Sequence, residues 1–342
     1  MRVSIVMPVR NEGSAIGDSL GAVLAQDYPP GDVEILVADG RSDDGTREYV
    51  QALMVRHPNL RLVDNPGRIV PTGLNQAIRI ASGTCIVRVD GHTVIDPDYV
   101  SRCVEALKRS GGENVGGPMR ARGIGWFGRA VAAATSVSFG VGGARFHYSR
   151  REEWVDTVYM GAWPRRVFEA YGGFDEEMVR NQDDEFNYRI LDGGGRILLS
   201  PAIRSVYTVR GSPRALWRQY FQYGFWKVRV MQKHPRQMRW RHFAPGAFVT
   251  VLAALPGAAL VWPAAWGVWG VVAGIYLAAA CAASLWTAKR SGWDLMPVLP
   301  IVFVILHLAY GTGFLVGLLR FIRRWGDRGR PAPIVPAGEA PA

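Results

Sequence analysis

Short apolar runs alternate with amphipathic stretches over the first hundred residues of the chain. Val3–Val9, Val33–Ala38 and Cys85–Val89 are largely apolar and have the length of buried strands. Between them, residues 14–26 and the segment that follows Thr72 carry apolar side chains on one helical face, and we expect Thr72 to cap the second of these helices. Strands that alternate with helices in this way predict an α/β fold with a parallel sheet.

The pattern changes after residue 243, where the chain becomes mostly Ala, Val, Leu, Gly and Trp. Three segments approach the roughly 20 residues that cross a membrane as a helix, and Trp residues lie near their ends: Ala244–Trp262, Trp266–Trp286 and Leu295–Leu319. A buried helical bundle in a soluble protein is the alternative, which the scarcity of charged residues disfavours. We therefore predict three parts: a cytoplasmic catalytic domain (1–240), a membrane domain of two to three hydrophobic helices (241–325) and a flexible tail (326–342).

The formal net charge of +11 is concentrated just ahead of the first apolar segment. Ten basic residues occur there without an acidic one: Arg204, Arg210, Arg214, Arg218, Lys227, Arg229, Lys233, Arg236, Arg239 and Arg241. Basic residues beside a membrane segment suit anionic lipids, at about 1 kcal/mol for each charge near the surface. Nucleic acid is a weaker candidate because neither zinc-finger spacing nor an aromatic RNA-binding motif is present. Membrane lipids are therefore the expected partner.

The side of the membrane follows from charge and from the start of the chain. The sequence opens on a strand-like run without a signal-peptide pattern, so we expect the catalytic domain in the cytoplasm, at the bacterial inner membrane. Arg218–Arg241, Lys289–Arg290 and the basic tail from Arg320 all favour the inside. Three crossings place the tail outside. Either the last segment is re-entrant or the charge rule is violated, and the sequence leaves both open.

Three carboxylates follow the predicted strands: Glu12, Asp39 and Asp90. The carboxyl ends of parallel strands meet at one edge of a sheet, where ligands of such folds bind. Three acids at three strand ends therefore predict a ligand site at this edge and not merely a solvated face.

An ordered set of motifs resembles those of family 2 glycosyltransferases. The N-terminal ones are VMPVRNE (6–12), VADGRSDDGT (37–46) and VRVDGH (87–92). The closer likeness is to the succinoglycan-biosynthesis glucosyltransferase subgroup, through NPGRIVP (65–71), GFDE (173–176), NQDDEFNYR (181–189), RQYFQYG (218–224) and HLAYG (307–311). The resemblance implies a GT-A fold, which is Rossmann-like, followed here by C-terminal transmembrane helices.

The resemblance also assigns residues to the nucleotide and the cation. It implies that Pro8 and Glu12 border the nucleoside and that Asp39 accepts the N3–H of uracil; a turn-forming Asp is the alternative for Asp39. Asp90 and His92 match the motif that binds the metal and the diphosphate, with His92 in place of the second Asp of many relatives. The cofactor is Mn²⁺ or Mg²⁺, and an imidazole ligand favours Mn²⁺. Alternatively, His92 contacts the diphosphate or caps the next helix.

For the base, the resemblance points to Asp183, with Asp184 in reserve; helix capping is the alternative role for this acidic run. Gln182 replaces the Glu that relatives carry beside the base. Processive relatives have Gln-x-x-Arg-Trp where this chain has QYFQY (219–223), which favours addition of a single sugar. Trp217, Tyr220, Tyr223 and Trp226 have helical spacing and form an interfacial helix or, as a second possibility, stack on the acceptor. The candidate acceptor or interfacial residues are Gln219, Tyr223 and Trp226.

Together these features predict an inverting, metal-dependent hexosyltransferase of cell-surface or exopolysaccharide biosynthesis. It would move one sugar from a nucleotide-sugar donor, a UDP-sugar, to a lipid-linked saccharide. Two alternatives remain open: a polyprenyl-phosphate sugar synthase and a catalytically silent membrane protein that binds nucleotide-sugar.

Overall fold

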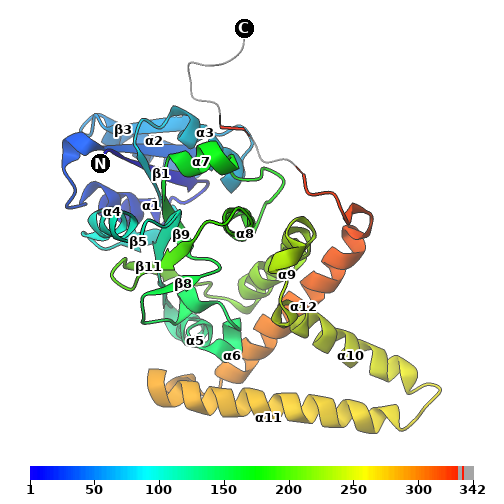
Figure 1. Cartoon of the computed structure of the whole chain (residues 1–342). Helices are drawn as coiled ribbons and strands as arrows, with labels where there is room; N and C mark the ends of the chain where they lie inside the picture. Colours follow the sequence, from blue (N-terminus) through cyan, green and yellow to red (C-terminus); the bar gives the residue numbers. More distant parts are fainter. Residues whose placement is uncertain (330–332, 335–342) are drawn as a thin grey trace. The chain divides into compact units, whose positions relative to one another are not determined.

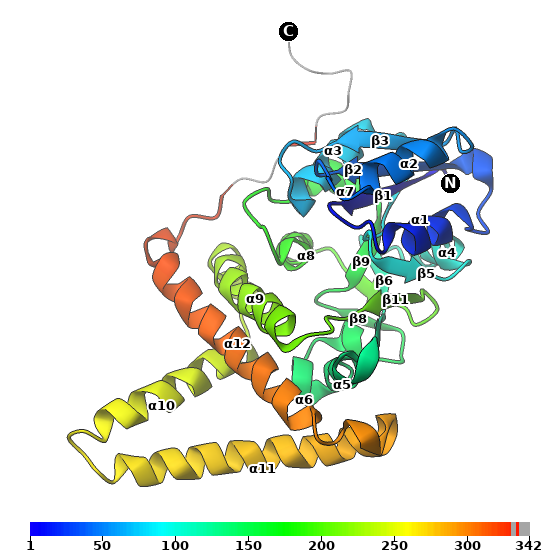
Figure 2. The ribbon, with the colours of Figure 1, turned by 180° about the vertical axis from the view of Figure 1, so that it is seen from behind.

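The computed structural model describes residues 1–329 and 333–334, and this part of the chain forms two compact units. The first is built from Met1–Arg120 and Ser149–Tyr207, and the second from Ala121–Tyr148 and Thr208–Arg328. Figure 1 and Figure 2 show the elements of both. Most of the predicted tail 326–342 lies outside the described residues.

The first unit is organised around an eight-stranded sheet with the order β3-β2-β1-β4-β9-β6-β10-β8. Its strands are β1 (Val3–Val9), β2 (Val33–Asp39), β3 (Leu60–Asp64), β4 (Cys85–Arg88), β6 (Asn114–Gly117), β8 (Glu153–Val155), β9 (Tyr159–Pro164) and β10 (Ile197–Leu199). Strands β3, β2, β1 and β4 pair with one another in parallel, as predicted, and β6 also pairs with β10 in parallel. The sheet is mixed and not parallel throughout, because β9 is antiparallel to both β4 and β6 and β8 is antiparallel to β10.

Helices bury both faces of this sheet. The alternating side chains Val3, Ile5 and Met7 of β1 form one apolar core, to which α1 (Ile16–Leu24), α2 (Thr46–Met54) and α4 (Tyr99–Ser110) contribute. The opposite face packs against α3 (Val70–Ile80). Because both faces are covered, every residue of β1 and β2 is buried, which explains their continuous apolar runs.

Helix α3 begins two residues ahead of its predicted cap. Ile69 is the N-cap and Pro71 lies in the first turn, where its missing N–H costs nothing. The Thr72 hydroxyl donates to Asn65 Oδ1 and to the Ile69 carbonyl, each at 2.8 Å. The prediction of Thr72 as a cap is therefore wrong, and its side chain instead fastens the turn that precedes the helix.

A smaller sheet and two helices accompany the eight-stranded sheet. A three-stranded sheet has the order β5-β11-β7; its strands are β5 (Thr93–Ile95), β11 (Ser205–Thr208) and β7 (Met119–Arg122). Helices α7 (Arg166–Tyr171) and α8 (Gln182–Asp192) follow β9. Helix α8 carries Asp183, Asp184 and Glu185 in its first turn, where carboxylates favour the helix dipole.

The second unit is helical. It contains α5 (Gly125–Thr135), α6 (Ser138–Val141), α9 (Pro213–Lys233), α10 (Ala244–Ala258), α11 (Ala265–Ser291) and α12 (Leu299–Arg320). Helices α9 and α12 run side by side in both views (Figure 1, Figure 2). A Cβ added at Gly224 of α9 would lie 2.0 Å from the Tyr310 carbonyl oxygen, and one at Gly313 of α12 would lie 2.0 Å from that of Phe221. Glycine is therefore required at both positions for the two backbones to approach so closely.

Two of the three predicted membrane segments form helices long and apolar enough to cross a membrane, α11 and α12. Helix α10 ends at Ala258 and has only 15 residues, about 22 Å at 1.5 Å per residue, which is shorter than the roughly 30 Å of a bilayer core. A span over Ala244–Trp262 is thus wrong in the described residues. In the apolar stretch of each helix, 11% of the residues of α11 and 44% of those of α12 are buried. The difference arises because α9 and α10 cover part of α12.

Candidate active site

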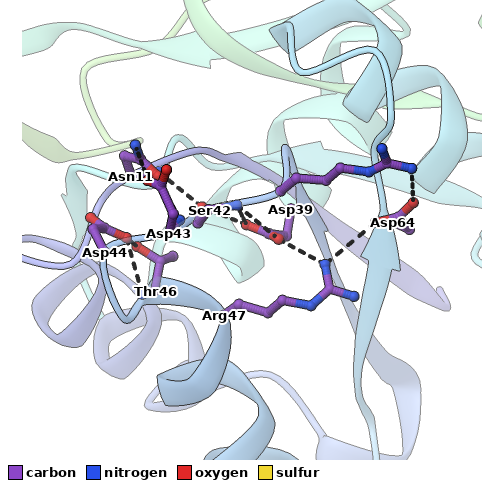
Figure 3. A network of polar contacts seen from close by, with 9 residues as sticks. Asn11, Asp39, Ser42, Asp43, Asp44, Thr46, Arg47 and Asp64 are labelled. Atoms are coloured by element: carbon purple, nitrogen blue, oxygen red, sulfur yellow. Dashed lines mark hydrogen bonds and ion pairs between the residues drawn. The ribbon is translucent and has the colours of Figure 1, made fainter.

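The loop after β1 is fastened to the loop after β2. Asn11 has a left-handed backbone with φ of 55°, and its N–H donates to the Ser42 hydroxyl at 2.9 Å. Its side-chain amide donates to Asp43 Oδ1 at 2.9 Å. Asp44 accepts from the Gly13 N–H at 2.8 Å and from the Thr46 hydroxyl at 2.6 Å, and these bonds lower the pKa of its carboxyl. The two strand ends therefore form one rigid frame (Figure 3).

Asp39 is the fully buried last residue of β2. Its Oδ1 accepts the Ser42 hydroxyl at 2.6 Å, and its Oδ2 accepts from Arg47 at 2.9 Å. The same Arg47 nitrogen lies 3.4 Å from Asp64 Oδ1. Figure 3 shows the Asp39 carboxylate between Ser42 and the Arg47 guanidinium. A buried carboxylate held by an ion pair has a fixed orientation, and an ionised carboxylate has about four lone-pair sites, enough for a further donor.

The loop between β4 and β5 carries Asp90 and His92. The Nδ1 atom of His92 lies 2.9 Å from Glu12 Oε1, so the first and fourth strands of the chain meet here. Glycine is required at position 91, between Asp90 and His92, because a Cβ there would lie 2.9 Å from Val9 Cγ1 and 3.1 Å from Glu12 Cγ. The His92 ring also makes an edge contact with Tyr207, with centroids 5.4 Å apart.

A buried arginine joins Asp90 to Asp183. Arg88, at the end of β4, is 3% exposed; its Nε lies 2.7 Å from Asp90 Oδ1, and its NH1 pairs with Asp183 Oδ1. Burial opposes the charge of the guanidinium, but the two carboxylates outweigh it and raise the pKa of Arg88. The central strand β4 thus presents one cation between two acids that come from separate parts of the chain.

Arg88 and Asp90 shift the pKa of Asp183 in opposite directions. Desolvation raises the pKa of its carboxyl, the Arg88 charge lowers it and the Asp90 charge raises it again; the result is a pKa of about 6. The side chain as a whole retains 26% exposure. A carboxylate of this pKa is largely ionised at neutral pH and is a stronger base than an ordinary Asp, which suits proton abstraction from a hydroxyl.

Comparison with known proteins now decides the family. The model described as Glycosyl transferase family 2 matches residues 4–172. The succinoglycan biosynthesis protein ExoA of Rhizobium meliloti (strain 1021) is 31% identical over 327 residues, which are 94% of this chain and 96% of that protein. The chain belongs to glycosyltransferase family 2. This confirms the resemblance drawn from the motifs, including the succinoglycan subgroup.

A second relative of this glycosyltransferase comes from Methanococcus voltae. It is 25% identical and aligns with 93% of this chain and 97% of its own length. Its name is dolichyl N-acetyl-alpha-D-glucosaminyl phosphate 3-beta-D-2,3-diacetamido-2,3-dideoxy-beta-D-glucuronosyltransferase.

Solved structures of other glycosyltransferases confirm the GT-A fold. The mannosyltransferase PcManGT from Pyrobaculum calidifontis, in complex with GDP-Man and Mn²⁺, has a TM-score of 0.58 and 22% identity, and the match covers 92% of this chain and 87% of that one. Residues 1–349 of S. aureus TarS, in complex with UDP, give a TM-score of 0.51 and 16% identity, with 95% and 92% covered. At these identities the likeness concerns the fold alone.

The residues around Asp90 fit a divalent cation that would be bound partly by the protein and partly by a diphosphate. Among the described residues, no three His, Cys, Asp or Glu side chains gather into a metal cage. Asp90 Oδ2 makes no bond to a described residue, and Glu12 holds His92 through Nδ1, which leaves Nε2 available. Cations of this kind are commonly held by one or two protein ligands plus substrate phosphates, and a carboxylate on the second nitrogen is the usual support of a metal-binding imidazole.

The structure joins four of the predicted site residues in two groups: Glu12 with His92, and Asp90 with Asp183 through Arg88. Asp184 follows Asp183 in the first turn of α8. Asp39 and Pro8 lie on the adjoining strands β2 and β1, where Pro8 is buried opposite Ala38. Sequence reasoning missed Arg88 and Arg47. A charged residue inside the otherwise apolar run Cys85–Val89 was the available signal for Arg88.

The predicted acceptor residues lie in the second unit, on α9. The Gln219 amide donates to the Tyr223 hydroxyl at 2.9 Å, consistent with their i, i+4 spacing on the helix. Trp226 packs against Phe321, with ring centroids 5.7 Å apart, beside the apolar cluster that joins α9 to α12. Trp217 is 40% exposed and Trp240, beyond the end of α9, is 83% exposed, as expected of interfacial aromatic residues.

Proposed function

We propose that this family 2 glycosyltransferase transfers a single sugar from a UDP-sugar to a lipid-linked saccharide at the cytoplasmic face of the membrane, with inversion at the anomeric carbon. The observation that carries the proposal is the junction of Asp90, Arg88 and Asp183. Arg88 joins Asp183, whose pKa is raised to about 6, to Asp90, and this pairing of a candidate base with a candidate cation ligand supports the proposal. The similarity to ExoA, whose printed name gives succinoglycan biosynthesis, supports a role in polysaccharide biosynthesis.

The nucleotide half of the site is assigned to the frame of β1 and β2. Asp39 accepts the N3–H of uracil, and the bond from Arg47 orients its carboxylate. Pro8 and the loop at Glu12 border the nucleoside. The TarS complex contains UDP, which supports a uridine donor, whereas the PcManGT complex contains GDP-Man. The identity of the base is therefore a point that the experiment below must test directly.

The reaction half of the site is assigned to Asp90, His92 and Asp183, with Asp184 in reserve. A divalent cation, Mn²⁺ by preference, supplies positive charge for the departing diphosphate when it is bound. Asp90 through its carboxylate and His92 through Nε2 are the residues that would hold it. The Asp183 carboxylate takes the proton of the acceptor hydroxyl, whose oxygen attacks the anomeric carbon from the side opposite the diphosphate. The C–O bond to the diphosphate breaks, and an α-linked donor yields a β-linked product.

The membrane assignment rests on α11 and α12. If both cross the bilayer and α10 lies at the interface, the basic segment ahead of α10 and the basic segment after α12 are on one side. This arrangement brings the two longer basic segments to the same side, as the charge rule favours, and it places Lys289 and Arg290 on the other side, against that rule. The catalytic unit is then on the cytoplasmic side, where lipid-linked saccharides are accessible.

The test uses the full chain in lipid nanodiscs with a panel of UDP- and GDP-sugars and two acceptors, a lipid-linked saccharide and a polyprenyl monophosphate. We expect transfer from a UDP-sugar to the saccharide and a β linkage by NMR of the product. Asp183→Asn should lower turnover by at least 10²-fold while UDP still binds. Sugar attached to the monophosphate would instead identify a polyprenyl-phosphate sugar synthase, and binding without any transfer would identify a silent protein.

A further inference from the structure

Arg88 is an unusual residue for the centre of this sheet. It ends β4 opposite Val6 of β1, and its neighbours Val87 and Val89 are fully buried. Placing a guanidinium in such surroundings costs several kcal/mol unless charged partners compensate for the lost water. An apolar residue would continue the strand without this cost, so the position calls for a role that needs the charge.

The two partners of Arg88 have different assigned roles. Its Nε donates to Asp90, on the cation side, and its NH1 donates to Asp183, the candidate base. The two acids are brought together by a group whose nitrogens lie in one rigid plane. Asp183 is 95 residues from Arg88 in the sequence and belongs to α8, so this ion pair ties the side chain of the candidate base to the end of β4. The body of α8 is held separately, through the bonds of Asn187 to Asn114 and Thr157.

The same contact sets up a competition. A divalent cation that takes Asp90 as ligand meets the positive guanidinium that already holds Asp90 Oδ1 at 2.7 Å. Like charges at such short range repel strongly even in a partly polar site. Binding of the cation to Asp90 therefore weakens the bond between Arg88 and Asp90, which leaves the guanidinium to Asp183.

We propose, resting on the function proposed above, that Arg88 is a positioning residue that couples the cation site to the base: it anchors Asp183 and competes with the divalent cation for Asp90. In the donor-free protein Arg88 takes the place of the cation's charge between the two acids. When the donor is bound, Arg88 holds the base alone. Arg88 thus couples occupation of the donor site to the position of the Asp183 carboxylate.

The experiment compares Mn²⁺ affinity with turnover. Mn²⁺ binding to the full chain is measured without nucleotide, from the electron paramagnetic resonance signal of free hydrated Mn²⁺. We expect Arg88→Gln to bind Mn²⁺ about tenfold more tightly, because the competing charge is gone, and to turn over at least 10²-fold more slowly, because Asp183 has lost its anchor. Arg88→Lys keeps the charge but not the planar fork, so its Mn²⁺ affinity should stay near wild type while its turnover falls.

A matched control is available in the same unit. Arg102 also contacts two carboxylates, Asp98 and Glu105, each at 3.1 Å, but it lies on the surface of α4. Arg102→Gln should change neither Mn²⁺ affinity nor turnover. If Arg88→Gln does not fold, the same comparison is made in the background of Asp183→Asn, where loss of Arg88 leaves one fewer unpaired acid. The double variant Arg88→Gln/Asp183→Asn should then bind Mn²⁺ more tightly than Asp183→Asn alone.

The outcomes separate the inference from the function on which it rests. Unchanged or weaker Mn²⁺ binding after loss of the Arg88 charge overturns the competition, and wild-type turnover in Arg88→Gln overturns the anchoring role. Either result leaves the glycosyltransferase proposal intact as long as the wild type transfers sugar. If Asp90→Asn retains full Mn²⁺ affinity, the assigned cation site itself is wrong.

Discussion

Glu12 holds His92: its Oε1 atom lies 2.9 Å from Nδ1 of the imidazole, across the loops that follow β1 and β4. The motif comparison had assigned Glu12 to the nucleoside and His92 to the cation as separate residues. Their contact makes the two residues act together, because a carboxylate on Nδ1 fixes the orientation of the ring and directs the lone pair of Nε2 away from Glu12.

This relationship predicts a loss of metal affinity without a loss of nucleotide contacts. Glu12→Gln keeps the shape of the side chain but removes the charge that supports the imidazole, and such supporting groups are worth about 10–100-fold in metal affinity. We expect weaker Mn²⁺ binding in the presence of UDP by a factor in that range, measured by electron paramagnetic resonance. His92→Gln should give a similar loss, and the double variant should add little to either. Unaltered Mn²⁺ binding in both single variants would mean that His92 is not a ligand.

The raised pKa of Asp183 predicts the acid limb of the pH–rate profile. A base must be ionised to accept a proton, so kcat/KM for the donor should fall about tenfold per pH unit below a pH of about 6, the pKa of this carboxyl in the donor-free protein. The profile is measured from initial rates at donor concentrations well below KM at every pH. An acid limb centred near 4, the ordinary value for Asp, would contradict the assignment of Asp183 as the base.

The same pKa makes a prediction for stability, with a definite sign. The folded protein binds the Asp183 proton more tightly than the unfolded chain does, so the contribution of this group to stability is complete below about pH 4 and is lost as the pH rises through about 6. Asp183→Asn lacks that dependence. The Tm of the wild type should therefore fall relative to that of the variant between pH 4 and pH 7 in parallel thermal scans. A constant difference in Tm across this range would show that the carboxyl titrates normally.

Asp39 provides a test of the nucleotide half of the site. Asp39→Asn should weaken UDP binding by about 10–100-fold, the worth of one hydrogen bond to a charged group, with no change in the Mn²⁺ dependence of turnover. Asp64→Asn is the matched control, since Asp64 also pairs with Arg47 but is about half exposed. Isothermal titration with UDP measures both. An equal effect of the two variants would mean that Asp39 acts only through Arg47.

The sequence was sufficient for the parallel half of the sheet because Val3–Val9 and Val33–Asp39 are buried on both faces and therefore apolar throughout. It was insufficient for β6, whose residues Asn114–Gly117 include two glycines and resemble a loop. The antiparallel insertion of β9 between β4 and β6 also has no local signature, because strand direction depends on which distant segments pair.

The candidate site shows the same division. Asp39 and Asp90 were identifiable because acids at the ends of predicted strands share an edge of the sheet. Arg88 was not, because its partner Asp183 is 95 residues away and no periodicity relates a strand residue to a helix so distant. The motif comparison found each acid separately, and only the fold shows that one guanidinium joins them.

The close approach of α9 and α12 gives the last prediction. Gly313→Ala places a methyl group 2.0 Å from the Phe221 carbonyl oxygen, a backbone atom that can move away only if the helices separate. Overpacking of this kind costs about 1–3 kcal/mol, so we expect a lower Tm for the second unit in detergent. Gly274→Ala on α11 is the control, because nothing lies within 4 Å of its added Cβ and Ala favours a helix. UDP binding should persist in both variants, since the nucleotide residues belong to the first unit. If Gly313→Ala were as stable as Gly274→Ala, α9 and α12 would not be packed through these glycines.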